Sequence, residues 1–244
     1  MKNITLIAGK EFKGYLSSPM AYIVICIFLL ISGGSFALYL SSTEYADTSI
    51  IGFIEPLKTF GSSIGNIFIP LFTSILTMRL LSEEKKLGTW ELLLTSPVKD
   101  FEVVIGKFLG SLGIFVMMII LTMYYPLLLI ILGDPDMGPI WTSYLGLLLL
   151  GSSALAVGVF ASSLTSNQIV AAVISGGILA VLWVAGLTTG TTGIGQALSY
   201  ISMSYHFSYF TIGVIDTRDI IYYLSIIALF LYSAIRSIET SRWS

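Results

Sequence analysis

The side chains that most often carry out catalysis are scarce in this chain of 244 residues, which holds one cysteine and one histidine. Cys26 has no second cysteine for a disulfide, and His206 alone cannot assemble a metal cluster. A serine protease inside a membrane would need a serine and a histidine that face each other. Serines are plentiful, but His206 falls in a polar segment, where we expect it to form interfacial hydrogen bonds. The residues therefore predict no catalytic site and no metal site.

Two Gly-Lys pairs could belong to phosphate-binding loops only if the residues around them matched. A P-loop has the pattern Gly-x-x-x-x-Gly-Lys-Ser/Thr, in which backbone N–H groups hold the phosphate. Gly9-Lys10 and Gly106-Lys107 lack both the first glycine and the final hydroxyl residue. The chain is therefore predicted to hydrolyse no ATP and to hold no cofactor of its own. A formal net charge of −2 likewise predicts no nucleic-acid partner.

The composition places the chain in a membrane. Hydrophobic residues make up 55% of it and charged residues 11%, and the mean hydropathy is +0.91. A soluble domain carries about 25% charge, so this chain cannot cover a water-exposed surface. The apolar residues form runs of about 20, the length that crosses a hydrocarbon core as a helix. We therefore predict an all-α polytopic membrane protein with six transmembrane helices, at about 20–40, 60–81, 108–132, 140–161, 169–187 and 220–238.

The basic residues predict the orientation, because cytoplasmic loops are enriched in Lys and Arg. Ten of the 12 fall before the first run, between the second and third, or after the sixth, and the other two are Lys58 and Arg218. Both termini and the 82–107 loop are therefore expected in the cytoplasm, and the 188–218 loop outside. A signal peptide cleaved near Ser35 is the alternative reading of the first run, but the 19 residues ahead of it are too many. The runs lack the buried acids of an ion-coupled carrier.

Residues 1–19 are predicted to form an amphipathic helix in the headgroup layer. Its apolar face holds Ile4, Ile7, Ala8 and Tyr15, and its basic face holds Lys2, Lys10 and Lys13. Glu11 falls on the apolar side, which predicts a protein neighbour or a pairing with a lysine. A basic flank that serves only to orient the first span is the alternative.

The 82–107 loop is the most informative segment. The second span is expected to continue through 83–87 and to end at Gly88, since glycine is favoured where a helix ends. Thr89 can then cap a second short helix, with Glu91 in its first turn. Trp90 and the leucines after it give this helix an apolar surface that predicts a docking element, and an interfacial anchor is the alternative.

Two weaker patterns concern packing. The outer loop carries periodic apolar and aromatic residues over 194–213, which predict one or two short helices in the outer interface. Glycines recur in or beside the spans and would permit helices to approach closely. They are Gly106, Gly110, Gly146, Gly151, Gly158, Gly176 and Gly177.

Three segments together resemble the ABC-2 type transporter permeases, and most closely the gliding-motility-associated branch. The first is Lys10-Glu11-Phe12 with Ser18-Pro19-Met20-Ala21-Tyr22, and the second runs from Glu83-Glu84-Lys85-Lys86 to Thr95-Ser96-Pro97. The third is Tyr205-His206-Phe207 with Arg218-Asp219. The likeness covers essentially the whole chain, and Trp90 departs from it, because a smaller or aliphatic residue is expected there.

The resemblance implies a permease subunit of an ATP-driven exporter in a prokaryotic plasma membrane. It would pair with a second permease chain, identical or homologous, and with two cytoplasmic ATPase subunits that bind ATP and Mg²⁺. An extracytoplasmic auxiliary subunit is a further expected partner. A non-transporting subunit that transmits ATPase motion to extracytoplasmic machinery is the alternative, and no substrate is specified. The residues expected to couple to the ATPase are Glu83, Glu84, Leu87, Gly88, Thr89, Trp90, Glu91 and Leu94, braced by the interfacial helix through Lys10, Glu11 and Lys13.

Overall fold

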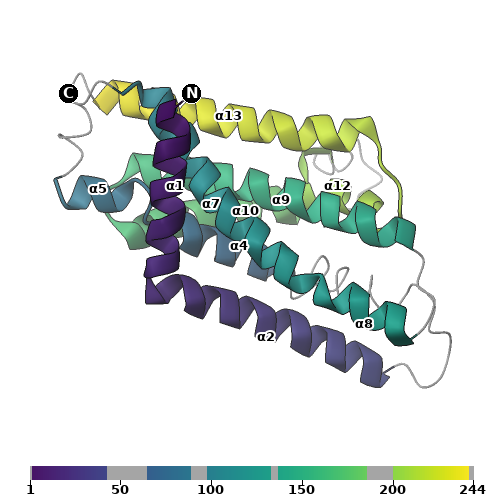
Figure 1. Ribbon diagram of the computed structural model, residues 1–244. Coiled ribbons are helices and arrows are strands. Elements are labelled where there is room, and N and C mark those ends of the chain that lie inside the picture. The colour runs from purple at the N-terminus through teal and green to yellow at the C-terminus, as the bar shows by residue number, and fades with distance from the viewer. Residues whose placement is uncertain (1, 43–64, 89–97, 133–136, 186–199, 242–244) are drawn as a thin grey trace.

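The computed structural model describes residues 2–42, 65–88, 98–132, 137–185 and 200–241, and the regular structure in these ranges is helical (Figure 1). The predicted all-α class is therefore confirmed. The helices are α1 (Lys2–Ser17), α2 (Pro19–Ser42), α4 (Gly65–Thr77), α5 (Ser82–Lys86), α7 (Asp100–Thr122), α8 (Tyr124–Leu132), α9 (Met137–Leu164), α10 (Gln168–Val184), α12 (Met203–Thr211) and α13 (Thr217–Ser241).

Three helical stretches in the described ranges are long and apolar enough to cross a membrane, namely Asp100–Leu128, Met137–Leu164 and Thr217–Thr240. A fourth candidate is the pair Asn3–Ser17 and Pro19–Gly34, whose two halves are bent by 76°. Helix α10 is apolar but shorter, and α4 has 13 residues. These lengths support a membrane protein with three to four candidate spans, and the full set of six stays a prediction.

Helix α9 lies at the centre of the bundle and contacts α4, α7, α10, α12 and α13. All ten residues over 150–159 are buried, because small side chains let the neighbouring helices surround it. The hydroxyl groups of Ser152 and Ser153 donate to carbonyl oxygens of their own helix, at 2.6 and 2.7 Å, so their burial leaves no polar group unpaired. Helix α13 differs, since only 11% of its most apolar stretch is buried.

The glycines of α9 mark its closest contacts. A Cβ on Gly146 would lie 2.7 Å from the ring of Phe210, one on Gly151 would meet Phe115, and one on Gly158 would meet Thr77. The close approach predicted for these three positions is therefore found. A Cβ on Gly177 would meet no described atom within 4 Å.

The second predicted span is interrupted, which corrects the expected continuous helix through 83–87. Helix α4 ends at Thr77, and a turn over 78–81 precedes α5. The cause is a side chain from α9, since Ser162 Oγ accepts hydrogen bonds from the backbone N–H groups of Leu81 and Ser82, both at 3.0 Å. Gly88 then follows α5 with a φ of +71°, the left-handed geometry expected of a glycine that ends a helix.

The third predicted span also has different bounds. Helix α7 begins at Asp100, eight residues before the expected start, because the carboxylate of Glu102 accepts a hydrogen bond from the backbone N–H of Lys99 at 3.2 Å and caps the first turn. It ends at Thr122, and α8 begins at Tyr124, just ahead of Pro126. This places the expected interruption at Met123.

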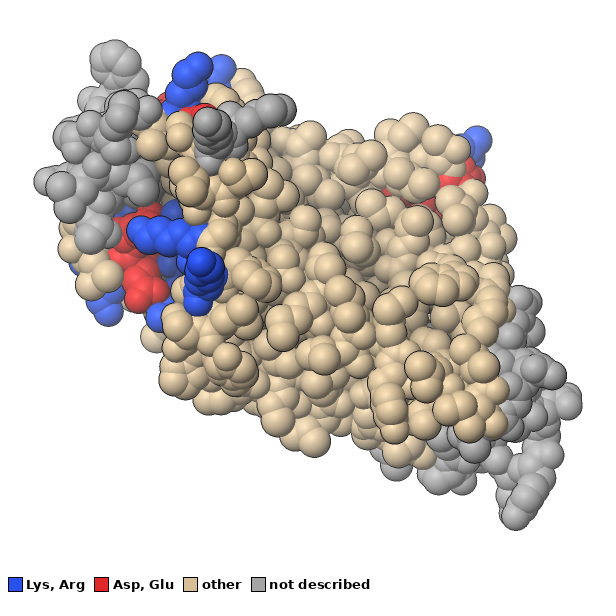
Figure 2. All heavy atoms as spheres, viewed as in Figure 1, with Lys and Arg blue, Asp and Glu red and all other residues tan. Residues whose placement is uncertain are grey.

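The charged side chains gather at the two ends of the long helices. In Figure 2, acidic and basic groups cluster at the end where α1 and α5 lie, and a smaller group lies at the opposite end. The visible face between them carries no charged group. Helix α1 and the C-terminal end of α13 lie at the same end of the molecule (Figure 1).

Candidate functional site

Helix α1 lies across α7, where glycines replace side chains. A Cβ on Gly106 would lie 2.7 Å from Ile7 Cγ2, and one on Gly110 would lie 2.6 Å from Glu11 Cβ and 3.2 Å from the carbonyl oxygen of Ala8. These two glycines therefore form the surface on which α1 rests, rather than a contact between two spans. This close contact between the two helices places the Glu11 side chain against α7.

A buried Lys107 forms the centre of a charge cluster that we call the inner cluster (Glu11, Glu84 and Lys107), whose two carboxylates are partly exposed. The Lys107 side chain is 2% exposed, and its ammonium pairs with the carboxylate of Glu11 and, at 2.9 Å, with Oε1 of Glu84. These groups come from α1, α5 and α7. A buried ammonium without a carboxylate would be strongly destabilising, so the cluster ties the three helices together.

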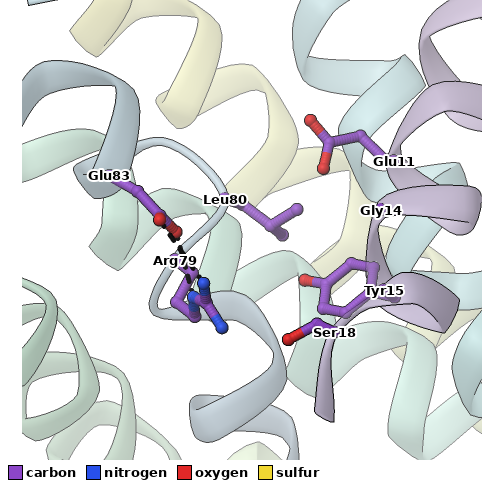
Figure 3. A pocket seen from close by; sticks show the side chains of 7 residues that line it. All are labelled: Glu11, Gly14, Tyr15, Ser18, Arg79, Leu80 and Glu83. Atoms are coloured by element: carbon purple, nitrogen blue, oxygen red, sulfur yellow. Dashed lines mark hydrogen bonds and ion pairs between the residues drawn. The ribbon is translucent and has the colours of Figure 1, made fainter. Parts of the chain in front are cut away.

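A second ion pair lies beside this cluster. Arg79 Nε and Nη2 donate to the two carboxylate oxygens of Glu83, at 2.9 and 3.4 Å. Figure 3 shows the two side chains directed toward each other at one wall of a pocket, with Glu11, Tyr15 and Ser18 opposite. The cavity has a volume of about 210 Å³.

Helix α5 is also held by α9. Lys85 Nζ donates to the carbonyl oxygen of Ser163 at 2.5 Å, and partial burial lowers the pKa of the Lys85 ammonium. Lys85 is therefore not a freely solvated surface charge, in contrast to the exposed Lys86. Together with the Ser162 contacts, this bond fixes the short helix against the central helix of the bundle.

The structure brings together some of the predicted coupling residues. Glu83 and Glu84 lie on α5 within reach of α1 and α7, whereas Leu87 is 66% exposed just beyond α5. Lys10 and Lys13 are on the exposed side of α1, away from the cluster. Gly88 ends this described segment with a positive φ. The other four predicted residues lie outside the described ranges and are Thr89, Trp90, Glu91 and Leu94.

Sequence reasoning placed Lys107 in the loop and missed its role as the centre of the cluster. Its only local signal was the misplaced Glu11, for which a protein neighbour or a lysine partner was expected, and the structure supplies the lysine. A second tie between the same helices was also missed, since Asn3 Nδ2 donates to Glu102 Oε2 at 3.1 Å. Both contacts join residues almost 100 positions apart, so no local pattern reveals them.

The opposite end holds a buried hydrogen-bonded pair, which we call the outer pair (His206 and Asp219). His206 Nδ1 lies 2.6 Å from Asp219 Oδ1, and Nε2 lies 3.0 Å from the carbonyl oxygen of Tyr200. His206 forms hydrogen bonds as expected, but it is 6% exposed rather than interfacial. Lys107 and Asp219 are both buried, and each lies one residue ahead of a predicted span, so the expectation that the spans themselves lack buried acids is not contradicted by them.

The comparison with protein families decides where this architecture belongs. The family described as ABC-2 family transporter protein matches residues 5–236, nearly the whole chain. The chain belongs to the ABC-2 transporter family. Comparison with the curated proteins gives no match. As an ABC-2 protein with several membrane-length helices, the chain is a multi-pass membrane protein of the permease type, a type that generally works with ATPase subunits. The match does not separate branches of the family, so the gliding-motility branch stays a prediction.

Proposed function

We propose that this ABC-2 chain is the permease subunit of an exporter with six spans and two cytoplasmic termini. It would lie in a prokaryotic plasma membrane, beside a second permease chain and two ATPase subunits. The family match over 5–236 supports the permease. The observation that carries the coupling role is the inner cluster, because it joins α5, which precedes the expected docking segment, to the membrane-length helix α7.

The mechanism follows from the ion pairs of the inner cluster, which link α5 to α7. When the ATPase subunits close on ATP, they would push the segment that follows Gly88 and therefore α5. Moving α5 alone would separate Glu84 from a buried ammonium, and breaking such a pair is strongly unfavourable. The lower-energy response is that α5, α7 and α1 move together. The ATPase stroke would then tilt α7, and through it the bundle around α9.

The segment after Gly88 is tested by replacing Trp90 with Ala. A buried aromatic anchor at an interface is worth ~2 kcal/mol or more, so association with the ATPase should weaken by roughly 30-fold. Association is measured by titrating the ATPase subunit onto the permease in nanodiscs. Glu91→Lys should reduce coupled ATP hydrolysis more than assembly, since the carboxylate orients the contact.

The matched control is Lys86→Gln, because Lys86 is exposed whereas Lys85 contacts Ser163. Exposed charges contribute little, so assembly and hydrolysis should stay at the parent level. Normal assembly and coupling in both the Trp90 and the Glu91 variants would refute the docking role of this segment.

The proposed orientation has its own test. In a variant without Cys26, single cysteines at Lys86 and Thr191 should react with an impermeant maleimide from opposite sides of the membrane. Labelling of both from the outside would contradict the six-span arrangement.

The alternative, a subunit that transmits motion without transport, predicts a different composition of the complex. Purification in mild detergent should then retain a large extracytoplasmic protein on the 188–218 side. An exporter should purify as two permease-type chains with two ATPase chains.

A further inference from the structure

The pocket beside the inner cluster lies between α1 with the adjoining Ser18, the turn that follows α4, and α5. Its volume of about 210 Å³ is many times the ~10–15 Å³ that a cavity needs to hold one water. Figure 3 shows Arg79 and Glu83 on one side and Glu11, Tyr15 and Ser18 on the other. The lining is completed by Gly14 and Leu80. This is a polar chamber with room for a small charged group.

A smaller, apolar cavity of about 20 Å³ adjoins the chamber and shares Tyr15, Ser18 and Arg79 with it. Its other walls come from α2 and α4, the helices that lead away from α1. They are Met20, Ala21, Val24, Ile75 and Leu76. The lining of the two cavities therefore changes from charged to apolar toward α2 and α4. A phospholipid has the same order of chemistry, from a charged headgroup to its apolar part.

The charges of the chamber favour a zwitterion over an anion. The lining holds the guanidinium of Arg79 and the carboxylates of Glu11 and Glu83. Glu11 also pairs with Lys107, which pairs with Glu84, so two cations and three carboxylates surround the pocket and one negative charge is in excess.

The guanidinium of Arg79 has five N–H bonds, of which the described contacts use three. One of these three is directed at Met20 Sδ at 3.4 Å, and a thioether is a weak acceptor. A phosphate oxygen would replace that sulfur with a stronger, charge-assisted bond, and an ammonium would lie between the carboxylates.

We propose that this pocket binds the headgroup of a phospholipid with a primary ammonium, phosphatidylethanolamine, from the leaflet beside α1. The phosphate contacts Arg79, the ammonium donates hydrogen bonds to Glu83 and Glu11, and the glycerol end of the lipid lies beside the small apolar cavity between α2 and α4. Phosphatidylcholine has the same charges but no N–H to donate, and phosphatidylglycerol has no cation. The inference rests on the proposed position of α1 in the headgroup layer, but not on the ATPase or on any transported substrate.

The test uses the purified full-length chain in micelles that contain equal amounts of the three phospholipids. Native mass spectrometry should find one phosphatidylethanolamine per chain, retained about tenfold more than phosphatidylcholine, as expected when charge-assisted hydrogen bonds are lost. Equal retention of these two lipids would overturn the proposal.

The decisive variant adds a side chain to the wall of the pocket. Gly14 lines the pocket, and a Cβ added there meets nothing within 4 Å, so Gly14→Leu narrows the pocket without a clash. Retention of phosphatidylethanolamine should fall by about tenfold or more. Gly9→Leu is the matched control, because Gly9 lies on the same helix, is equally open and does not line the pocket.

A second variant tests the phosphate contact separately from the ammonium contacts. Arg79→Gln should weaken retention of phosphatidylethanolamine and phosphatidylcholine alike, since both carry the phosphate. Arg236→Gln is its control, because Arg236 forms a similar ion pair with Glu239, at 2.8 Å, but is exposed on α13.

Unchanged lipid retention in Gly14→Leu would refute the proposal. If that variant instead loses the ATPase, the pocket is a protein contact. Loss of lipid with normal ATPase assembly would leave the coupling proposal intact.

Discussion

The inner cluster and the outer pair both bury charge near the end of a helix, but they connect different parts of the chain. Glu11 and Lys107 are 96 residues apart and Glu84 comes from a third helix, whereas His206 and Asp219 are 13 residues apart on the successive helices α12 and α13. The inner cluster therefore joins elements that could move independently. The outer pair closes a local turn.

The two sites also differ in how much apolar packing surrounds them. His206 is stacked on Tyr222, with ring centroids 3.9 Å apart, and α12 packs on α9. Apolar and aromatic contacts thus support the outer pair from several sides. The inner cluster relies more on its charges, because α5 has only five residues and is held to the bundle by hydrogen bonds and ion pairs. Where a helix buries little apolar surface, as α5 does, ion pairs and hydrogen bonds hold it against the rest of the bundle.

The largest expected effect comes from removing the centre of the inner cluster. Lys107→Met removes the charge-assisted contacts of two carboxylates that are 23% and 25% exposed. Hydrogen bonds to charged groups are worth about 1.5–3 kcal/mol each, and partial solvation favours the low end, about 3 kcal/mol for the two. The free energy of unfolding should fall by that amount in a detergent titration of the purified chain. ATPase coupling should fall as well, since α5 is no longer tied to α7.

The control for this change is Lys86→Met, at an exposed lysine of α5. A parent-like stability of Lys107→Met would mean that the two carboxylates do not depend on the ammonium, and the inner cluster would lose its role as a joint.

A smaller effect is expected at the outer pair. Asp219→Asn keeps the size of the side chain but removes its charge, and a hydrogen bond to a charged group is worth about 1.5–3 kcal/mol. Stability should fall by that amount while ATPase coupling stays at the parent level. Asp216→Asn is the matched control, because Asp216 is exposed and close in sequence. Coupling lost in Asp219→Asn would contradict the separation of the two sites.

The smallest effect is expected where α1 contacts Gly106 and Gly110 of α7. Gly110→Ala places a Cβ against Glu11 and the backbone of Ala8, and overpacking costs typically about 1–3 kcal/mol. We expect the low end, ~1 kcal/mol, since α1 is a terminal helix that can shift. The readout is cross-linking between cysteines at Asn3 and Glu102, which should decrease. Gly177→Ala, at an open glycine, should leave it unchanged, and equal cross-linking in both variants would argue against this contact.

The elements that could be predicted are those whose cause is local. The apolar runs predict the helical class, because a chain in lipid must satisfy its backbone polar groups internally. Gly88 predicts the end of α5, because glycine adopts a positive φ without strain. The glycines of α9 predict close packing, although not which side chains fill the space.

The features that were missed depend on contacts between distant segments. The turn over 78–81 exists because Ser162, some 80 residues later, accepts the N–H groups of Leu81 and Ser82. The burial of Lys107 likewise depends on two carboxylates from other helices. Glu11 was the one residue whose misfit on its own helix indicated such a partner. No local rule could identify which lysine would supply it.

The 76° bend between α1 and α2 gives α1 the geometry of a lever. Its 16 residues span about 24 Å at ~1.5 Å per residue. Rotation by about 10° around the bend at Ser18 would therefore displace the Asn3 end by roughly 4 Å. Because Gly106 and Gly110 contact α1 and Asn3 is hydrogen-bonded to Glu102 of α7, α1 follows α7 along its length, and a tilt of α7 becomes a sideways displacement of α1 about the bend at Ser18.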